Sequence, residues 1–122
     1  MKKRILLISY EQILLDTWQM LMERKGLEVH PALGFAEALE ICQVSCACDL
    51  VVMGHSMPPK DKTALLAALR QKCKAPLLSI RKHDEPTLPE ADYSVDSSQG
   101  PAAFLDAVKN ALKLNSSRVR QA

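Results

Sequence analysis

The sequence predicts an α/β domain in which a parallel β-sheet carries helices on both faces. Short apolar segments of strand length alternate with longer segments in which apolar residues recur every three or four positions, the period of a helix. This alternation repeats along most of the chain, as it does in parallel βαβ units with right-handed crossovers. The 122 residues fit one domain of ordinary size, and 48% of them are hydrophobic, which is enough for a packed core.

Five segments have the length and composition of β-strands. The first, residues 4–8, is a short apolar run of the kind found in strands that are buried on both faces of a sheet. The last, residues 93–95, is the weakest of the five. The predicted strands are residues 4–8, 27–31, 49–53, 76–80 and 93–95.

Four segments have the periodicity of helices that lie on a core. In residues 11–25 the apolar positions 14, 18, 21 and 22 share one helical face, and Gly26 provides a stop. A helix at residues 101–114 begins with proline at the favoured first position. Residues 81–90 contain two prolines and no apolar period, so we expect at most one helical turn there. The predicted helices are residues 11–25, 35–44, 63–72 and 101–114.

The two ends and the charge bound the class of protein. We expect a domain over residues 1–114 and a flexible polar C-terminal tail over residues 115–122. The apolar run after the basic start covers only residues 5–8, too short for a signal peptide or a membrane span, so we expect a soluble, cytoplasmic protein. A net charge of +2 gives no argument for nucleic-acid binding.

Four cysteines stand at positions 42, 46, 48 and 73, without the C-x2-C spacing of a zinc site. We expect buried or unreactive thiols and no metal, since cytosolic cysteines are normally reduced. Cys46, Cys48 and Cys73 precede two strands that we expect to be neighbours. A bridge from Cys73 to either of the other two is therefore conceivable, and redox sensing remains an alternative.

Ligands of open parallel sheets bind beyond the carboxyl ends of the strands, so the residues that follow each predicted strand are the candidates for a site. Several motifs carry a resemblance. They are RILLISYEQILLDTWQMLMERKGLEV, GFAEALEICQ, DLVVMGHSMPPKD, APLLSIR and ADYSVD. In their order and spacing they resemble the receiver domain of bacterial response regulators, the CheY-like family, over nearly the whole chain. The resemblance implies a flavodoxin-like, three-layer α/β/α fold with strand order 2-1-3-4-5 and a fourth helix that is shortened or missing here.

The resemblance also implies a phosphorylation chemistry that this chain does not have the residues to perform. A working receiver needs an aspartate that accepts a phosphoryl group, acidic ligands for Mg²⁺, a lysine for the phosphoryl charge and a switch hydroxyl. Here the acidic pair falls on Ser9 and Tyr10, with only the neighbouring Glu11 acidic; the acceptor falls on Gly54, the switch hydroxyl on Arg81 and the lysine on Asp96. Asp61 matches an aspartate that the family uses structurally.

These replacements predict a pseudo-receiver, a non-enzymatic signalling module without cofactor or metal that binds a protein partner or a second copy of itself. Two alternatives remain. One is a redox or anion sensor that uses Cys46, Cys48 and Cys73, or Arg81. The other is a phosphorelay receiver with an unusual acceptor, for which His55 is a candidate, although a spectator loop histidine is favoured.

Two local hypotheses follow from the same positions. Arg81 and Asp96 follow two predicted strands that are neighbours in the receiver order, so an ion pair between them could fill the vacated pocket; solvent exposure of both is an equal alternative. Leu15, Met20 and Met22 make the first helix apolar beyond one stripe, most simply because they belong to the core, with an interaction surface as the less favoured reading.

Overall fold

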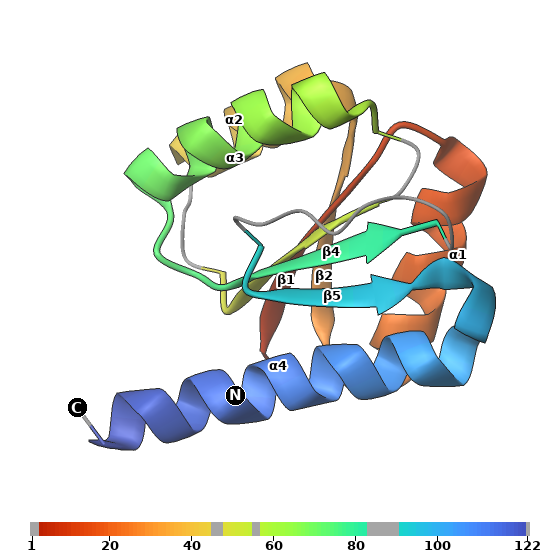
Figure 1. Cartoon of the computed structure of the whole chain (residues 1–122), viewed down its shortest axis with the longest axis vertical. Coiled ribbons are helices and arrows are strands. Elements are labelled where there is room, and N and C mark those ends of the chain that lie inside the picture. Colours follow the sequence, from red (N-terminus) through yellow and green to blue (C-terminus); the bar gives the residue numbers. More distant parts are fainter. Residues whose placement is uncertain (1–2, 45–47, 55–56, 83–90, 122) are drawn as a thin grey trace.

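The computed structural model describes residues 3–44, 48–54, 57–82 and 91–121 of the chain. Five parallel strands form one sheet in the order β2-β1-β3-β4-β5 (Figure 1). The strands are β1 (Arg4–Ser9), β2 (Glu28–Leu33), β3 (Leu50–Met53), β4 (Leu77–Arg81) and β5 (Tyr93–Asp96). The predicted strand order is confirmed.

The helices cover both faces of this sheet, which gives the three layers that were predicted (Figure 1). One face packs against α1 and α4, and the other packs against α2 and α3. A short 3-10 turn joins β5 to α4. The helices are α1 (Gln12–Glu23), α2 (Gly34–Val44), α3 (Pro59–Lys72) and α4 (Pro101–Gln121), and the turn is η1 (Ser97–Gln99).

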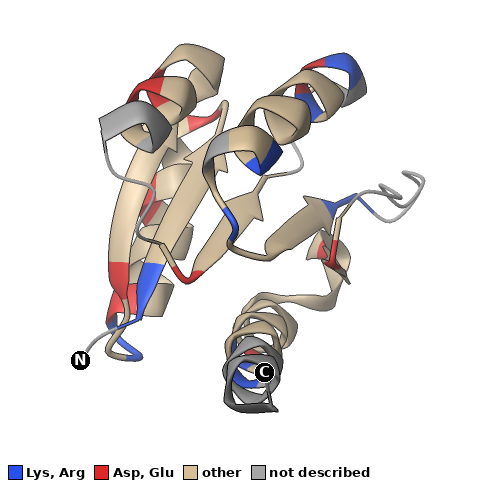
Figure 2. Cartoon of the chain, turned by 90° about the vertical axis from the view of Figure 1, so that its left-hand side faces the viewer, with Lys and Arg blue, Asp and Glu red and all other residues tan. Residues whose placement is uncertain are grey.

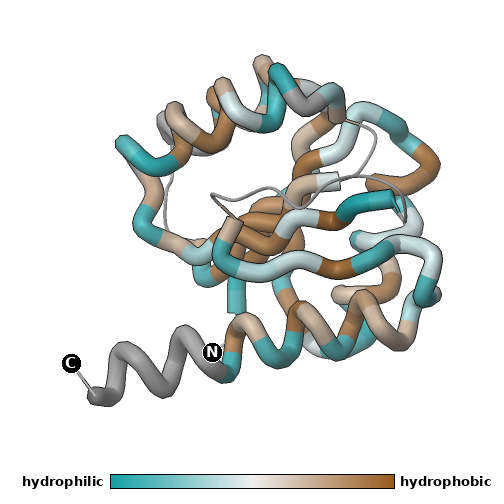
Figure 3. Tube along the Cα trace, in the orientation of Figure 1, coloured by the Kyte–Doolittle hydropathy of each residue, from teal (hydrophilic) through white to brown (hydrophobic). Residues whose placement is uncertain are grey.

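Strand β1 explains how one apolar run serves both layers. Ile5 and Leu7 pack with the α1 and α4 side chains, whereas Leu6 and Ile8 pack with α2 and α3. All four are at most 3% exposed. Successive strand residues point to opposite faces, so a central strand between two helical layers must be apolar at every position, as the brown strands in Figure 3 show.

Two helix boundaries differ from the prediction. Helix α3 begins at Pro59 rather than at residue 63, because proline fits the first helical turn, where its missing N–H is not needed. Helix α4 continues to Gln121, past the predicted end at residue 114, because no glycine or proline interrupts it. The domain boundary at residue 114 stays a prediction. Of residues 81–90, where at most one helical turn was predicted, Arg81 ends β4, and residues 83–90 lie outside the described residues.

Two carboxylates organise the amino-terminal edge of the sheet. Asp49 accepts a hydrogen bond from the Arg4 backbone N–H at 2.8 Å. Asp92 accepts one from the Leu77 backbone N–H at 2.7 Å and pairs with Arg70 at 2.8 Å. These acids therefore fix the starts of strands and lie far from the carboxyl ends, where ligands bind.

Two further properties of the described residues are the distribution of charge and the hydropathy of the helices. Figure 2 shows acidic and basic residues interspersed over the described part of the fold. One opposite pair is in contact, with Nε of Arg4 2.9 Å from Oε2 of Glu28. No helix of the described residues is long and apolar enough to span a bilayer.

Candidate functional site

The predicted site residues gather at the carboxyl edge of the sheet, which is called the rim below. Ser9, Arg81 and Asp96 are the last residues of β1, β4 and β5, and Gly54 directly follows β3. The register places Arg81 opposite Asp96. Parallel strands end at the same edge, so the topology brings these residues together as the sequence predicted. His55 lies outside the described residues.

On β1, the two positions of the expected acidic pair are engaged in other contacts. The buried Ser9 hydroxyl accepts from the Glu11 N–H at 3.1 Å and donates to the Glu11 carbonyl at 3.2 Å, closing the turn before α1. The Tyr10 hydroxyl donates to the Asp61 carboxylate at 2.8 Å, which ties β1 to the first turn of α3. The Glu11 side chain is exposed.

The Tyr10–Asp61 contact predicts a pH-dependent term in stability. Burial, and then the hydrogen bond and the negative charge of Asp61, raise the pKa of Tyr10 from 10.0 to about 12. The folded chain therefore holds this proton more tightly than the unfolded chain. The resulting stabilisation is complete below pH 10 and is lost as the pH rises through 12.

We expect Tyr10→Phe to remove this term. Urea unfolding at a series of alkaline pH values would show the free energy of unfolding falling more steeply in wild type than in the variant between pH 10 and 12. Because Tyr93 is the second tyrosine of the chain, the difference in tyrosinate absorbance between wild type and Tyr10→Phe would follow the Tyr10 ionisation. Parallel loss of stability in both proteins would contradict the assignment.

Gly54 is closely covered by neighbouring atoms. Its backbone N–H donates to the Ile8 carbonyl at 2.8 Å. A Cβ atom at this position would lie 3.0 Å from Cζ3 of Trp18 and 3.1 Å from the Ile8 carbonyl oxygen, both tighter than ordinary carbon contacts. The indole of Trp18 is 9% exposed and stacks on Phe104 at a centroid distance of 5.8 Å. The indole thus lies against the place where a Cβ at position 54 would stand.

Lys62 is a rim residue that sequence reasoning missed. Its side chain is 4% exposed, and its Nζ donates to the Ser79 hydroxyl and to the Ile80 carbonyl, both at 3.2 Å. Ser79 lies beside Met53 in the sheet register, so the ammonium sits near the end of β3. It approaches from the α2 and α3 layer, whereas Trp18 covers Gly54 from the α1 and α4 layer.

Asp96 stands where the resemblance implies a lysine, and its carboxylate organises the local turn. One oxygen accepts from the Ser98 backbone N–H at 2.9 Å and from the Ser98 hydroxyl at 2.7 Å, which caps η1. The Arg81 guanidinium donates to the Lys82 carbonyl at 3.5 Å. The strand register agrees with the proposed Arg81–Asp96 ion pair, and the pair itself stays a prediction.

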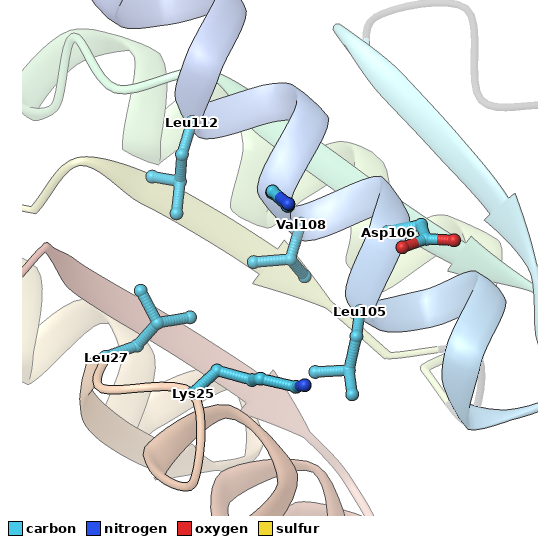
Figure 4. A pocket seen from close by; sticks show the side chains of 7 residues that line it. Lys25, Leu27, Leu105, Asp106, Val108 and Leu112 are labelled. Carbon is cyan, nitrogen blue, oxygen red and sulfur yellow. The ribbon is translucent and has the colours of Figure 1, made fainter.

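Two cavities of the structure are large enough to compare with small-molecule binding sites. A cavity of about 140 Å³ lies beside Trp18 and Asp96, smaller than a typical small-molecule site. A larger one, of about 430 Å³, lies between the α1–β2 connection and α4 (Figure 4). None of the predicted site residues lines the larger cavity. Its lining residues are Lys25, Leu27, Leu105, Asp106, Val108, Lys109 and Leu112.

The remaining predicted groups are the cysteines and any side chains that could bind a metal. Among residues within the described ranges, no three His, Cys, Asp or Glu side chains gather closely enough to hold a metal ion. Cys46 lies outside the described residues. Cys48 and Cys73 are brought together at the opposite edge of the sheet from the rim, with their sulfurs 3.2 Å apart.

Comparison with known proteins shows the fold. No family model matches the sequence, and no curated protein gives a significant match. Among solved structures, the N-terminal domain of a response regulator/sensory box/GGDEF three-domain protein from Carboxydothermus hydrogenoformans matches with 23% identity and a TM-score of 0.83, over 96% of this chain and 99% of that one.

Two further solved structures have the same fold. A CheY-like response regulator receiver domain protein from Methanospirillum hungatei JF-1 has 20% identity and a TM-score of 0.82, over 97% of this chain and 99% of its own. The signal receiver domain of an HD domain-containing protein from Pseudomonas fluorescens Pf-5 has 22% identity and a TM-score of 0.79, over 96% and 99% of the two chains. The chain therefore has the flavodoxin-like fold of CheY and of response regulator receiver domains.

Proposed function

We propose that this chain is a pseudo-receiver, a non-enzymatic signalling module that binds a protein partner independently of aspartyl phosphorylation. One observation carries the proposal. At the position where the resemblance implies the acceptor aspartate, the chain has a glycine whose missing side chain is replaced by the Trp18 indole, 3.0 Å from the site of a Cβ. A glycine offers no nucleophile, and any side chain at this position would first have to displace the indole.

The other rim contacts support a single fixed conformation. In a receiver, as the resemblance implies, a phosphoryl group draws a lysine and a hydroxyl toward the acceptor. Here Lys62 binds β4, Tyr10 binds Asp61, and Asp96 binds Ser98, so each of these groups has a contact within the protein itself. Partner binding would then depend on the amount of the protein rather than on its phosphorylation state.

Two of the alternatives, a receiver with an unusual acceptor and an anion sensor, are less favoured for electrostatic reasons. Asp96 places a carboxylate where a receiver needs a cation, and a carboxylate repels both a phosphoryl group and other anions. The same charge opposes an anion sensor at Arg81, because Arg81 lies opposite Asp96 in the register. A phosphorelay receiver with a different acceptor remains an outcome that the following experiment can detect.

Acetyl phosphate with Mg²⁺ is expected to leave the mass of the intact protein unchanged. A receiver domain that has its aspartate, treated in the same reaction, must gain one phosphoryl group for the test to count. The fluorescence of Trp18, the single tryptophan of the chain, should also be insensitive to Mg²⁺, because the indole lies against position 54. A mass gain of one phosphoryl group would overturn the proposal, and peptide mapping would then locate the unexpected acceptor.

The exposed side of α1 is our candidate for the partner surface. Ile13 is 79% exposed and Met20 is 45% exposed, and the seven-residue spacing places them on one face, two turns apart. Of the three residues that make this helix broadly apolar, Leu15 and Met22 are buried in the core and Met20 is exposed. Two such side chains on one face favour a small apolar contact with another protein.

This surface gives the proposal its second test. Affinity capture from source-cell extracts, with the wild type as bait, should retain the same partner whether or not the bait was first treated with acetyl phosphate. The double variant Ile13→Lys/Met20→Lys should lose it, whereas a control change on the same helix, Gln19→Lys, should not. Sedimentation of the purified protein would show whether the partner is a second copy. Binding that requires phosphodonor treatment would contradict phosphorylation independence.

A further inference from the structure

Cys48 and Cys73 form a thiol pair that the proposed function does not use. Their sulfurs are 3.2 Å apart, although the residues are 25 positions apart in the chain. Cys73 is 4% exposed and ends α3, where its backbone N–H donates to the Leu69 carbonyl at 2.6 Å. Cys48 is partly exposed and lies two residues before β3.

The pair is placed to form a disulfide without rearranging the fold. A disulfide needs its sulfurs about 2.05 Å apart, so closure requires a movement of roughly 1 Å. Both cysteines also belong to the packed layer of α2 and α3, where Cys73 is a core residue and Cys48 lies against that core. Tight packing holds the two side chains toward each other, which favours one pairing over the others that four cysteines allow.

We propose that Cys48 and Cys73 are a reversible oxidation site whose substrate is a peroxide. The thiolate of Cys48, the more exposed of the two, attacks one peroxide oxygen, which breaks the O–O bond and gives a Cys48 sulfenic acid and one water. The Cys73 thiolate then attacks the Cys48 sulfur and displaces hydroxide, which leaves as a second water. In sum, two thiols and hydrogen peroxide give one disulfide and two waters; the sulfurs lose two electrons and the peroxide gains them.

This disulfide would close a loop that contains the β3–α3 unit of the fold. The loop runs from Cys48 through β3, Gly54 and Lys62 to the end of α3. A covalent link across it removes conformations from the unfolded chain and resists separation of α3 from the sheet. Oxidation would therefore stabilise the part of the chain that carries two of the rim residues, while leaving the rim chemistry itself unchanged.

The experiment is a thiol count on the full chain before and after a modest excess of hydrogen peroxide. The reduced protein should show four free thiols, since the chain has four cysteines, and the oxidised protein two. Non-reducing peptide mapping should find Cys48 joined to Cys73, and dithiothreitol should restore all four thiols. The oxidised form should melt about 10 °C above the reduced form.

Matched variants separate this pairing from general oxidation. Cys48→Ser, at a partly exposed site, should keep the fold by circular dichroism and lose both the disulfide and the shift in melting temperature. Cys46→Ser, two residues away, should retain both. The inference is overturned if four thiols persist after peroxide, if the mapped bridge involves Cys46 or Cys42, or if Cys48→Ser still forms an intramolecular disulfide. None of these outcomes bears on the acetyl phosphate test.

Discussion

Restoring an aspartate at position 54 is expected to destabilise the protein rather than to revive phosphorylation. Gly54→Asp should lower the free energy of unfolding by about 3–5 kcal/mol, because it adds side-chain atoms to a packed site and buries a charge there. Its Cβ would meet the Trp18 ring at 3.0 Å and the Ile8 carbonyl oxygen at 3.1 Å. Urea unfolding followed by circular dichroism measures the effect.

Two further variants divide the expected loss into its causes. Gly54→Ala adds only the Cβ and should cost about 1–3 kcal/mol, and Gly54→Asn adds the shape of aspartate without its charge. We expect the order of stability wild type, Ala, Asn, Asp. The backbone of Gly54 does not require glycine, because it is the one of the four described glycines without a positive φ, which Gly26, Gly34 and Gly100 have. An alanine variant as stable as wild type would show that Trp18 moves aside easily, and the proposed exclusion of an acceptor side chain would then be wrong.

Trp18→Ala is expected to have a comparable effect, about 3–5 kcal/mol, for the opposite reason: it leaves a cavity. Trp18 is 9% exposed, and its ring stacks on Phe104 of α4 at an angle of 30°, so the substitution removes contacts between α1, α4 and the rim. Circular dichroism is again the suitable probe, because the variant has no tryptophan. Trp18→Phe keeps an aromatic ring against Phe104 and should lose less.

A double-mutant cycle joins the two predictions. If the indole is what fills the space beside Gly54, then Gly54→Ala should cost less in the Trp18→Ala background than in wild type. The residual cost should reflect the Ile8 carbonyl, which remains 3.1 Å from the new Cβ. Independent sites add within about 0.5 kcal/mol, so strict additivity would contradict the direct contact.

The fold was accessible from the sequence because its signals are local and repeated. Central strands such as β1 are apolar along most of their length when helices cover both faces, which the sequence shows directly, whereas the strand order was implied by the resemblance to receiver domains. Helix ends were less predictable. The start of α3 at Pro59 depends on a proline that the first helical turn accepts, whereas the extension of α4 to Gln121 depends on the absence of a stop signal.

The site was predictable in position but not in contacts. Sequence order alone placed Ser9, Gly54, Arg81 and Asp96 at one edge, since each follows a strand. That Trp18 lies over Gly54 depends on how α1 is rotated and tilted against the sheet, which the helical period does not fix. For Cys73 the sequence left Cys46 and Cys48 as equal partners, and the 3.2 Å contact of the Cys48 and Cys73 sulfurs depends on how the end of α3 packs beside β3.

Lys62 was overlooked although the sequence held a signal for it. Leucines follow it at three, four and seven positions along the chain, and this spacing places Lys62 on the buried face of α3. Those leucines are Leu65, Leu66 and Leu69, each at most 3% exposed. A lysine on a buried face is normally assumed to reach solvent. The expected start of the helix at residue 63 also removed Lys62 from the pattern.

Because Lys62 is buried, the reactivity of its amine would report how often α3 separates from the sheet. An acylating reagent reaches an amine only when it is exposed and has a free lone pair, and this one is held against Ser79 and Ile80 under α3. Chemical labelling of Lys62 in the native protein would therefore proceed only as fast as α3 lifts from β4.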